Sequence, residues 1–590
     1  MSISIEPAAL HYRVAVADLH AHLFHVTLTI TEPLAMQELS LPVWIPGSYL
    51  VREFAKNLQN LRASQQGQPV ACVQLNKQRW QTASQPGQPL VLEYEVYAND
   101  PSVRTASLDA LRGFFNGTSL CLRPEGLTEH SCVLEVVPPE LPANQPGWQC
   151  ATGLAAIQTD PAGFGFYRAA DYDELTDSPV EMGNFWSTEF VAAGVPHRLV
   201  VAGAAPSLDA SRLLADTQRI CEAAIRFWHG TEPPPFQHYV FLLHATADGY
   251  GGLEHRHSTA LICARSDLPR QGQTQPSEGY TTLLGLISHE YFHTWNVKRL
   301  RPAEFTRYDY SQENYTELLW FFEGFTSYYD DLLLRRAGLI DDATYLKLLG
   351  KTIAQVQQTP GRLVQTVAQA SMDAWIKYYR QDENTPNATV SYYTKGALVA
   401  LCLDLTLRHE GQTTLDVVMQ ALWRRCAGGP MTEADLRAVL RDWAGRSFDA
   451  ELDAWVHSTA ELPVPALLAA HGIAQQTEDA PAAQILGLRV TENGGIRLQT
   501  VLRGSLAERA GMAANDEWLG LEVQGQGWRL RKLADVALYA GHATRVTALV
   551  VRGERLLRLP LELPGAEART VASQWQVSDS AAATRWLSGH

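Results

Sequence analysis

The first third of the chain alternates between hydrophobic and polar positions. Between residues 22 and 30 every second residue is hydrophobic, and the same alternation returns between residues 90 and 96. A period of two is typical of strands that bury one face. Segments rich in Pro, Gly and Gln, such as residues 65–69 and 85–89, separate these runs. The pattern predicts a β-sandwich over residues 1–170.

The middle of the chain changes to a mixed and then a helical pattern. Strands are expected at residues 197–202 and 238–244, on either side of a helix over residues 207–229. After a polar loop over residues 269–278, apolar residues recur at helical spacing to about residue 470. The sequence predicts a mostly helical domain over residues 171–472.

Short β-like runs return beyond residue 475, around a small helix near residues 505–510. They predict a compact β-rich module over residues 473–565, so that the fold class is multidomain α+β. The last segment, residues 566–590, is rich in Ala, Ser and Thr, and we expect it to be a flexible tail. The predicted runs are residues 485–490, 496–501, 546–551 and 556–561.

Composition narrows the classes of function. Of the 590 residues 46% are hydrophobic and 19% charged, which is ordinary for a globular protein. A formal net charge of −15 argues against a nucleic-acid or anionic-membrane binder, because phosphate binding needs clustered positive charge. We see no secretory signal and no apolar run long enough to span a membrane. The eight cysteines form no CxxC pair, so we expect free thiols and a cytoplasmic location.

Residues 289–293 read His-Glu-Tyr-Phe-His. Four residues advance a helix by about 400°, so His289 and His293 project from one face, a turn apart, and can bind one metal ion. Glu290 lies beside them, where a carboxylate can take a proton from water. The surrounding residues are hydrophobic, and buried His and Glu need partners. The motif predicts one zinc ion per chain.

A catalytic zinc site needs a third protein ligand. The metzincin extension is absent, since Asn296 and Arg299 stand where it has Gly and His. Glu323 is flanked by aromatic residues in a helical stretch, where a carboxylate is hard to solvate, so we expect it to be the third ligand. A buried ion pair with an arginine is the alternative. The downstream carboxylates compared were Glu304, Glu313, Glu317 and Glu323.

A Gly-Gly pair and a glutamate follow the strand expected at residues 238–244. Gly251 and Gly252 let a ligand backbone approach closely, and an exposed edge strand can pair with an extended peptide. Glu254 can then bind the ammonium group of the peptide. The alternative is that these residues form an ordinary loop without a binding role, which is the more common case for a Gly-Gly turn.

Two tyrosines, Tyr392 and Tyr393, precede an apolar helix expected over residues 397–407. A phenol hydroxyl can stabilise the oxyanion of a tetrahedral intermediate. Tyrosines before a helix are more often packing residues, and the pattern does not choose between these two.

Together these residues resemble the glycyl aminopeptidase family of gluzincin metallopeptidases. The resemblance implies a β domain, a thermolysin-like catalytic domain and a C-terminal PDZ-like module. It also implies an enzyme that acts on peptides with a free N-terminus and prefers Gly or Ala as the first residue. The segments that carry it are residues 42–49 (Pro-Val-Trp-Ile-Pro-Gly-Ser-Tyr), 250–255, 289–299, 320–329 and 392–396.

The resemblance also implies a role for each matching residue. Glu290 becomes the general base, Glu254 the anchor of the substrate amine and Tyr393 the oxyanion tyrosine. The exopeptidase motif of the related aminopeptidases falls on residues 251–255, where His255 replaces their final Asn. The zinc ligands implied are His289, His293 and Glu323.

One spacing differs from that of the related aminopeptidases. Their shorter interval would put the third ligand at Gln312, which is a poor zinc ligand. We therefore expect an inserted loop at about residues 301–310.

The C-terminal module resembles a PDZ domain. Residues 486–488 (Leu-Gly-Leu) suit a loop that presents backbone N–H groups to a carboxylate, and residues 504–507 begin the adjacent helix. The module either binds the C-termini of other chains or packs against the catalytic domain.

A zinc aminopeptidase is the leading hypothesis, and two others stay open. One is a zinc endopeptidase whose substrates are recruited by the PDZ-like module, and internal fragments among its products would identify it. The other is a non-catalytic peptide-binding or chaperone-like protein with a vestigial metal site. Peptide binding without zinc would identify that one.

Overall fold

The computed structural model describes residues 8–141, 146–565 and 571–589. Residues 1–7 of the predicted sandwich, and residues 566–570 and 590 of the predicted tail, lie outside the described residues. The chain divides into two compact units, and each is described by itself. The first is Met1–Tyr315 with Trp423–Met431, and the second is Thr316–Leu422 with Thr432–His590.

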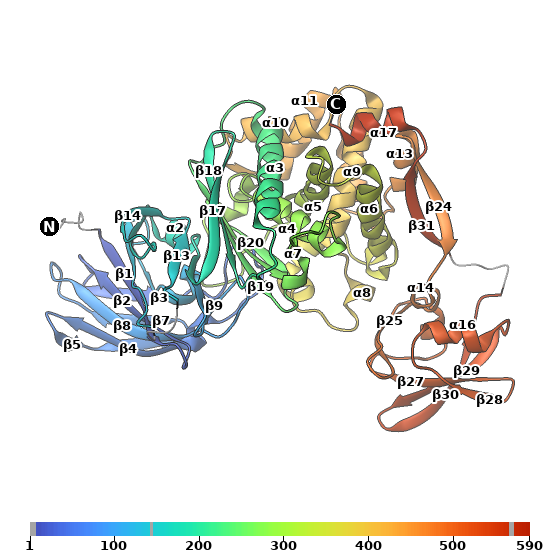
Figure 1. The fold of residues 1–590 in the computed structure, drawn as a ribbon, viewed down its shortest axis with the longest axis horizontal. Coiled ribbons are helices and arrows are strands. Elements are labelled where there is room, and N and C mark those ends of the chain that lie inside the picture. Colours follow the sequence, from blue (N-terminus) through green and yellow to red (C-terminus); the bar gives the residue numbers. More distant parts are fainter. Residues whose placement is uncertain (1–7, 142–145, 566–570, 590) are drawn as a thin grey trace. The chain divides into compact units, whose positions relative to one another are not determined.

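The N-terminal part of the first unit is a β-rich domain, drawn in blue to teal in Figure 1. The predicted strands near residues 22–30 and 90–96 are confirmed, and they pair with each other as β2 and β8. In β2 every second side chain is fully buried, from Phe24 to Ile30, because alternate residues of a strand share a face. The strands are β1 (Leu10–Asp18), β2 (Leu23–Ile30), β3 (Met36–Ser40), β4 (Leu58–Gln65), β5 (Gln68–Val70), β6 (Cys72–Asn76), β7 (Arg79–Ala83), β8 (Leu90–Tyr97), β9 (Ala106–Leu108), β10 (Arg112–Phe115), β11 (Arg123–Pro124), β12 (Cys132–Val136), β13 (Gln149–Thr152), β14 (Ala155–Thr159), β15 (Gly165–Ala169) and β16 (Val180–Gly183).

These strands form an eight-stranded sheet in the order β14-β15-β12-β1-β2-β8-β4-β5 and two four-stranded sheets, β13-β16-β10-β9 and β11-β3-β7-β6. One hydrophobic core joins residues of all three sheets. Short helices lie between strands: η1 (Phe54–Asn57), α1 (Gly117–Leu120) and α2 (Tyr172–Thr176).

The rest of the first unit is a five-stranded sheet with two helices packed against it. Its order is β17-β18-β19-β21-β20, with β18, β19 and β21 parallel and β20 antiparallel at the edge. The strands and helices are β17 (Phe185–Ala192), β18 (Val195–Ala202), α3 (Ala210–His229), β19 (Tyr239–Thr246), β20 (Gly251–Glu254), β21 (Ser258–Ala264), η2 (Arg265–Asp267), α4 (Glu278–Phe292), β22 (Arg301–Pro302), η3 (Ala303–Phe305) and β23 (Pro430–Met431). The predicted strands and helix of this region are confirmed.

The second unit begins with helices, of which α5 and α9 pack most closely. A Cβ atom added at Gly324 would lie 2.5 Å from the Cα atom of Gly396, so only two glycines allow this approach of the two backbones. Helix α9 begins at Tyr392, five residues earlier than expected, because the Ser391 hydroxyl accepts a hydrogen bond from the Thr394 N–H and caps it. The helices are α5 (Leu319–Arg336), α6 (Asp342–Gln357), η4 (Pro360–Leu363), α7 (Val367–Met372), η5 (Ala374–Tyr378), α8 (Thr385–Ala388), α9 (Tyr392–Glu410), α10 (Leu415–Arg425), α11 (Glu433–Ala444), α12 (Asp449–Trp455) and α13 (Val464–Ala470).

A β-rich module follows, as expected. The strand predicted at residues 485–490 is shorter, because residues 482–486 form helix α14, which Gly487 ends at a φ of 69°. The elements are β24 (Ile473–Asp479), α14 (Ala482–Leu486), β25 (Leu488–Thr491), β26 (Ile496–Val501), α15 (Leu506–Arg509), β27 (Glu517–Val523), β28 (Gln526–Arg529), α16 (Ala534–Ala540), β29 (Arg545–Arg552) and β30 (Arg555–Glu562).

The segment expected to be a flexible tail is folded from residue 571 to residue 589. Strand β31 (Val571–Val577) pairs with β24, and helix α17 (Ser580–Leu587) packs against α5. The buried Trp586 indole donates a hydrogen bond to the Tyr328 hydroxyl at 3.0 Å. The segment is rich in Ala, Ser and Thr, which suggested flexibility. A few of its large apolar side chains are nevertheless buried and hold it against the fold.

Within the described ranges, no helix is long and apolar enough to cross a membrane. The eight cysteines are free, as predicted, and all but Cys72 and Cys426 are buried.

Candidate functional site

Helix α4 places the two histidines of the motif together. His289 lies in its last turn, and His293 follows directly with helical backbone angles. Their Nε2 atoms are 3.1 Å apart. Two nitrogen ligands at tetrahedral positions about 2.0–2.1 Å from zinc are themselves about 3.3 Å apart. The spacing of the two imidazoles therefore fits a single bound zinc ion.

The ring of His293 is oriented by a backbone carbonyl. Its Nδ1 donates a hydrogen bond to the oxygen of Asn296 at 2.7 Å, which leaves the lone pair of Nε2 available to a metal. The next residue, Val297, is buried and has a φ of 134°, a conformation that β-branched residues rarely adopt. The sequence does not predict this role of Asn296, because the contact is made by a backbone atom and does not depend on residue type.

Glu290 faces the edge strand β20. Its side chain is buried, and any Cβ atom at Gly252 would overlap its carboxylate. Gly252, expected to allow a ligand backbone to approach, thus also makes room for Glu290. Gly251 has a φ of 155° and lies beside the guanidinium of Arg104, which donates a hydrogen bond to the Gly252 oxygen at 3.2 Å. Arg104 was not found from the sequence.

Glu254 joins the same group. Its carboxylate and ligand atoms of Glu290 and His293 lie within 4.8 Å of one another. Only 4% of Glu254 is exposed, and no hydrogen bond or salt bridge of its carboxylate is seen among the described residues, although its charge acts at longer range on the Lys298 ammonium, whose pKa it helps to raise. A buried carboxylate without such a partner is costly, and two carboxylates this close repel each other. The arrangement therefore favours a cationic ligand beside Glu254.

His255 points into a separate polar network. Its Nδ1 lies 3.1 Å from Oδ1 of Asp177, which also accepts a hydrogen bond from Nζ of Lys298 at 2.7 Å. Burial alone would raise the pKa of Asp177, but the Lys298 ammonium and the hydrogen bond from His255 hold that pKa well below its usual range. His255, expected to lie among the substrate-binding residues, thus contacts the Asp177–Lys298 ion pair, and its substrate-binding role stays a prediction. Neither Asp177 nor Lys298 was found from the sequence.

Glu323 and Tyr393 lie on the helices α5 and α9 of the second unit. Glu323 is 2% exposed. Burial raises the pKa of Tyr393 well above its usual value, and the negative charge of Glu323 raises it further, so the phenol stays protonated. The Tyr393 hydroxyl lies 3.4 Å from that of Tyr379. Tyr392, the alternative, is fully buried and stacks on Tyr393.

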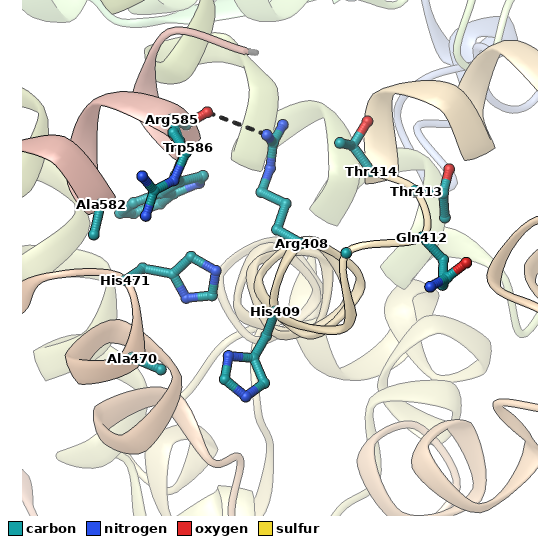
Figure 2. Close-up of a pocket in the computed structure, with 11 residues that line it drawn as sticks. Arg408, His409, Gln412, Thr413, Thr414, Ala470, His471, Ala582, Arg585 and Trp586 are labelled. Atoms are coloured by element: carbon teal, nitrogen blue, oxygen red, sulfur yellow. Dashed lines mark hydrogen bonds between the residues drawn. The ribbon is translucent and has the colours of Figure 1, made fainter.

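The second unit also holds a cavity of about 470 Å³ between the end of α9 and α17 (Figure 2). Its lining contains none of the predicted site residues. Arg408, whose guanidinium donates to the Arg585 oxygen at 3.3 Å, is already paired with Asp404 at 3.0 Å. The Arg408 guanidinium is therefore engaged in contacts within the fold, and we do not assign this cavity to the functional site.

We next compared the chain with known protein families and solved structures. Residues 11–184 match the peptidase M61 N-terminal domain, and residues 282–399 match the M61 glycyl aminopeptidase domain. A crystal structure of an aminopeptidase N family protein from Idiomarina loihiensis is 37% identical, with a TM-score of 0.91 over 98% of this chain and 100% of that chain. The chain belongs to the M61 glycyl aminopeptidase family. It is a metallo-aminopeptidase by that membership.

More distant structures are also similar to this M61 chain. The M1 zinc metallopeptidase from Deinococcus radiodurans is 17% identical, with a TM-score of 0.47 over 77% of this chain and 94% of that one. A form of that enzyme bound to the substrate Tyr-Ser-Ala is 16% identical, with the same TM-score and coverage. The comparison with curated protein sequences gave no match.

The matched segments of the M61 chain include most of the predicted site residues. Residues 282–399 contain the two histidines, Glu290, Glu323 and Tyr393. Of the carboxylates compared with Glu323, Glu304 and Glu317 are exposed and Glu313 is half-buried. Gln312 is exposed and bonds to Asp309. The expected insertion corresponds to β22, η3 and the loop that follows.

Proposed function

We propose that this M61 member is a zinc-dependent aminopeptidase that hydrolyses the first peptide bond of peptides with a free N-terminus. The observation that carries the proposal is the position of Glu254. A buried carboxylate without a hydrogen bond, beside Glu290 and His293, is suited to the α-ammonium group of a peptide. Anchoring that group sets which bond meets the catalytic residues, so the enzyme removes one residue at a time.

His289, His293 and Glu323 would hold one zinc ion per chain. The 3.1 Å spacing of the imidazoles and the burial of Glu323 support this set, which matches the donors that catalytic zinc prefers. When bound, zinc supplies Lewis-acid chemistry that polarises a carbonyl group and acidifies water.

Glu290 acts as the general base. It accepts a proton from the attacking water as the water adds to the first peptide carbonyl, and it returns that proton to the leaving amine. Gly252 supports this role, because the absence of a side chain there keeps the carboxylate in place. Tyr393 donates a hydrogen bond to the oxyanion, which requires the protonated phenol that its raised pKa maintains.

Substrate preference and domain assignment complete the proposal. The family description names glycine, and we extend the preference to Ala, the next smallest residue. We assign residues 171–472 as the thermolysin-like catalytic domain and residues 473–565 as the PDZ-like domain. Strand β25 lies at the edge of its sheet, and a cavity of about 250 Å³ lies between α14 and α16. Helix α14, which lines the cavity, leads directly into β25, and an exposed strand edge suits the C-terminal peptide of another chain.

Turnover of aminoacyl-anilides with Gly, Ala, Leu and Arg, with and without a chelator, tests the proposal. We expect the Gly and Ala substrates to be cleaved fastest, and all turnover to stop when the chelator removes zinc. Activity that is indifferent to the chelator would contradict zinc dependence. Internal fragments from a longer peptide would show an endopeptidase instead.

A further inference from the structure

A turn of the N-terminal β-rich domain reaches the Glu254 carboxylate. Residues 45–48 read Ile-Pro-Gly-Ser, and the Ser48 N–H donates a hydrogen bond to the Ile45 oxygen at 3.1 Å. Pro46 and Gly47 occupy the two central positions, and Gly47 has a φ of 90°. This is a type II turn, in which the second central position favours glycine.

Gly47 lies directly against Glu254. A Cβ atom added at Gly47 would be 2.5 Å from Oε1, 2.6 Å from Oε2 and 2.7 Å from Cδ of Glu254. These distances are far below van der Waals contact, so a side chain at Gly47 forces the carboxylate to move. The Glu254 side chain can make that shift at small cost to the fold. The shift therefore moves the carboxylate away from the position in which it is proposed to bind the substrate amine.

The turn itself is held rigidly. The Arg52 guanidinium donates a hydrogen bond to the Ser48 hydroxyl at 2.9 Å. The Trp44 indole donates to the Asp309 oxygen at 2.8 Å, and the Val43 N–H donates to the Tyr310 oxygen at 2.9 Å. Ile45 and Ser48 are almost completely buried. The turn is therefore unable to move aside, and the carboxylate must do so.

We propose that Gly47 is a positioning residue for Glu254. The turn at residues 45–48 forms a wall on one side of the carboxylate and holds it where it meets the substrate α-ammonium. The β-rich domain is then part of the amine subsite, in addition to its structural role. This inference rests on the proposed amine-binding role of Glu254.

The chain offers a matched control for Gly47→Ala. Residues 85–88 read Gln-Pro-Gly-Gln, and the Gln88 N–H donates to the Gln85 oxygen at 3.3 Å. Gly87 has a φ of 78°, and a Cβ atom there would meet nothing within 4 Å. Gly87→Ala thus imposes the same kind of backbone strain in the same domain and leaves the site untouched.

The test is a double-mutant cycle on the full-length zinc enzyme, with kcat/KM for alanyl-anilide as the readout. We expect Gly47→Ala to lower kcat/KM at least about 10-fold, because displacement of a positioned group by about 1 Å costs this much or more. Gly87→Ala should stay within about 2-fold of the parent. In the Glu254→Asp background the shorter side chain vacates the space, so adding Gly47→Ala should cost less than about 3-fold.

An equal loss from Gly47→Ala in the parent and in the Glu254→Asp background would overturn the inference. If Gly47→Ala is insoluble alone, the double variant decides: recovery of soluble protein supports the clash with Glu254, and continued insolubility contradicts it. Failure of the proposed function is recognised separately. In that case Glu254→Ala retains parental kcat/KM whatever residue stands at position 47.

Discussion

Gly252 and Glu290 pack so closely that no side chain fits between the edge strand β20 and the carboxylate on α4. The glycine on the strand and the proposed base on the helix thus depend on each other for their positions. Because a positioned proton acceptor works only at hydrogen-bond reach, the placement of Glu290 depends on a residue that has no side chain of its own.

Gly252→Ala is expected to lower kcat by about 100-fold, because the displaced carboxylate no longer reaches its proton. Zinc content should be unchanged, since Gly252 is not among the proposed ligands. Steady-state kinetics and metal analysis of the same sample check both statements. Parental kcat in this variant would mean that Glu290 tolerates the shift and that its position is less critical than proposed.

Glu290→Gln should retain zinc and lose about 100-fold to 10,000-fold in kcat, because the amide is unable to accept the proton. The amide has almost the same size as the carboxylate, so the fold is preserved. Metal analysis beside turnover separates the two effects. Full activity in this variant would remove Glu290 from the role of general base.

Glu323→Ala is expected to lose bound zinc, because two imidazoles alone hold the ion weakly. Glu317→Ala is the control, since Glu317 is exposed and lies in the same stretch of chain. Zinc per chain, measured after dialysis, is the readout. Equal zinc in both variants would show that the third ligand lies elsewhere.

Breaking the Asp177–Lys298 pair should destabilise the protein strongly. Lys298→Met leaves the Asp177 carboxylate, whose side chain is only 14% exposed, without its buried ammonium partner, and loss of one partner of a buried pair costs about 3–5 kcal/mol. Urea unfolding monitored by tryptophan fluorescence gives the change. A decrease in the free energy of unfolding below about 1 kcal/mol would mean that His255 and the backbone N–H groups stabilise the Asp177 carboxylate without Lys298.

His197 makes stability depend on pH. Burial lowers its pKa to about 4, while the unfolded chain has the ordinary value of about 6.5. Between these values the unfolded state binds the proton more tightly, so the free energy of unfolding falls as the pH falls, by about 1.4 kcal/mol per pH unit from this group.

The comparison of parent and His197→Gln protein by urea unfolding at pH 7 and pH 5 isolates that contribution. Other titrating groups are common to both proteins and cancel. We expect the variant to lose less stability between the two pH values than the parent loses. An equal loss in both would contradict the assignment to His197.

Elements with a strong local pattern were predictable from the sequence. Alternation over residues 22–30 indicated a strand, and the spacing of His289 and His293 indicated one helical face. The exact ends of helices, where capping residues compete with the apolar pattern, were harder to predict. Ser391 starts α9 earlier than the apolar pattern suggested, and Gly487 ends a short helix where a strand was expected.

Long-range partners left no trace in the pattern. Asp177 and Lys298 are over a hundred residues apart, and Arg104 reaches Gly252 across a similar interval. His255 is an example: its place in a motif suggested a substrate contact, and its contact with Asp177, which belongs to a distant segment, had no counterpart in that motif. Contacts of this kind depend on the fold as a whole and become visible only in the structure.

Hydrolysis of a matched pair of peptides tests the central claim most directly. The two peptides share one sequence beginning with Ala, and one of them is acetylated at its N-terminus. The account predicts that mass spectrometry finds free alanine released from the first peptide and no cleavage of the second. Efficient cleavage of the acetylated peptide would contradict the anchoring of the ammonium group by Glu254 and, with it, the proposed aminopeptidase mechanism.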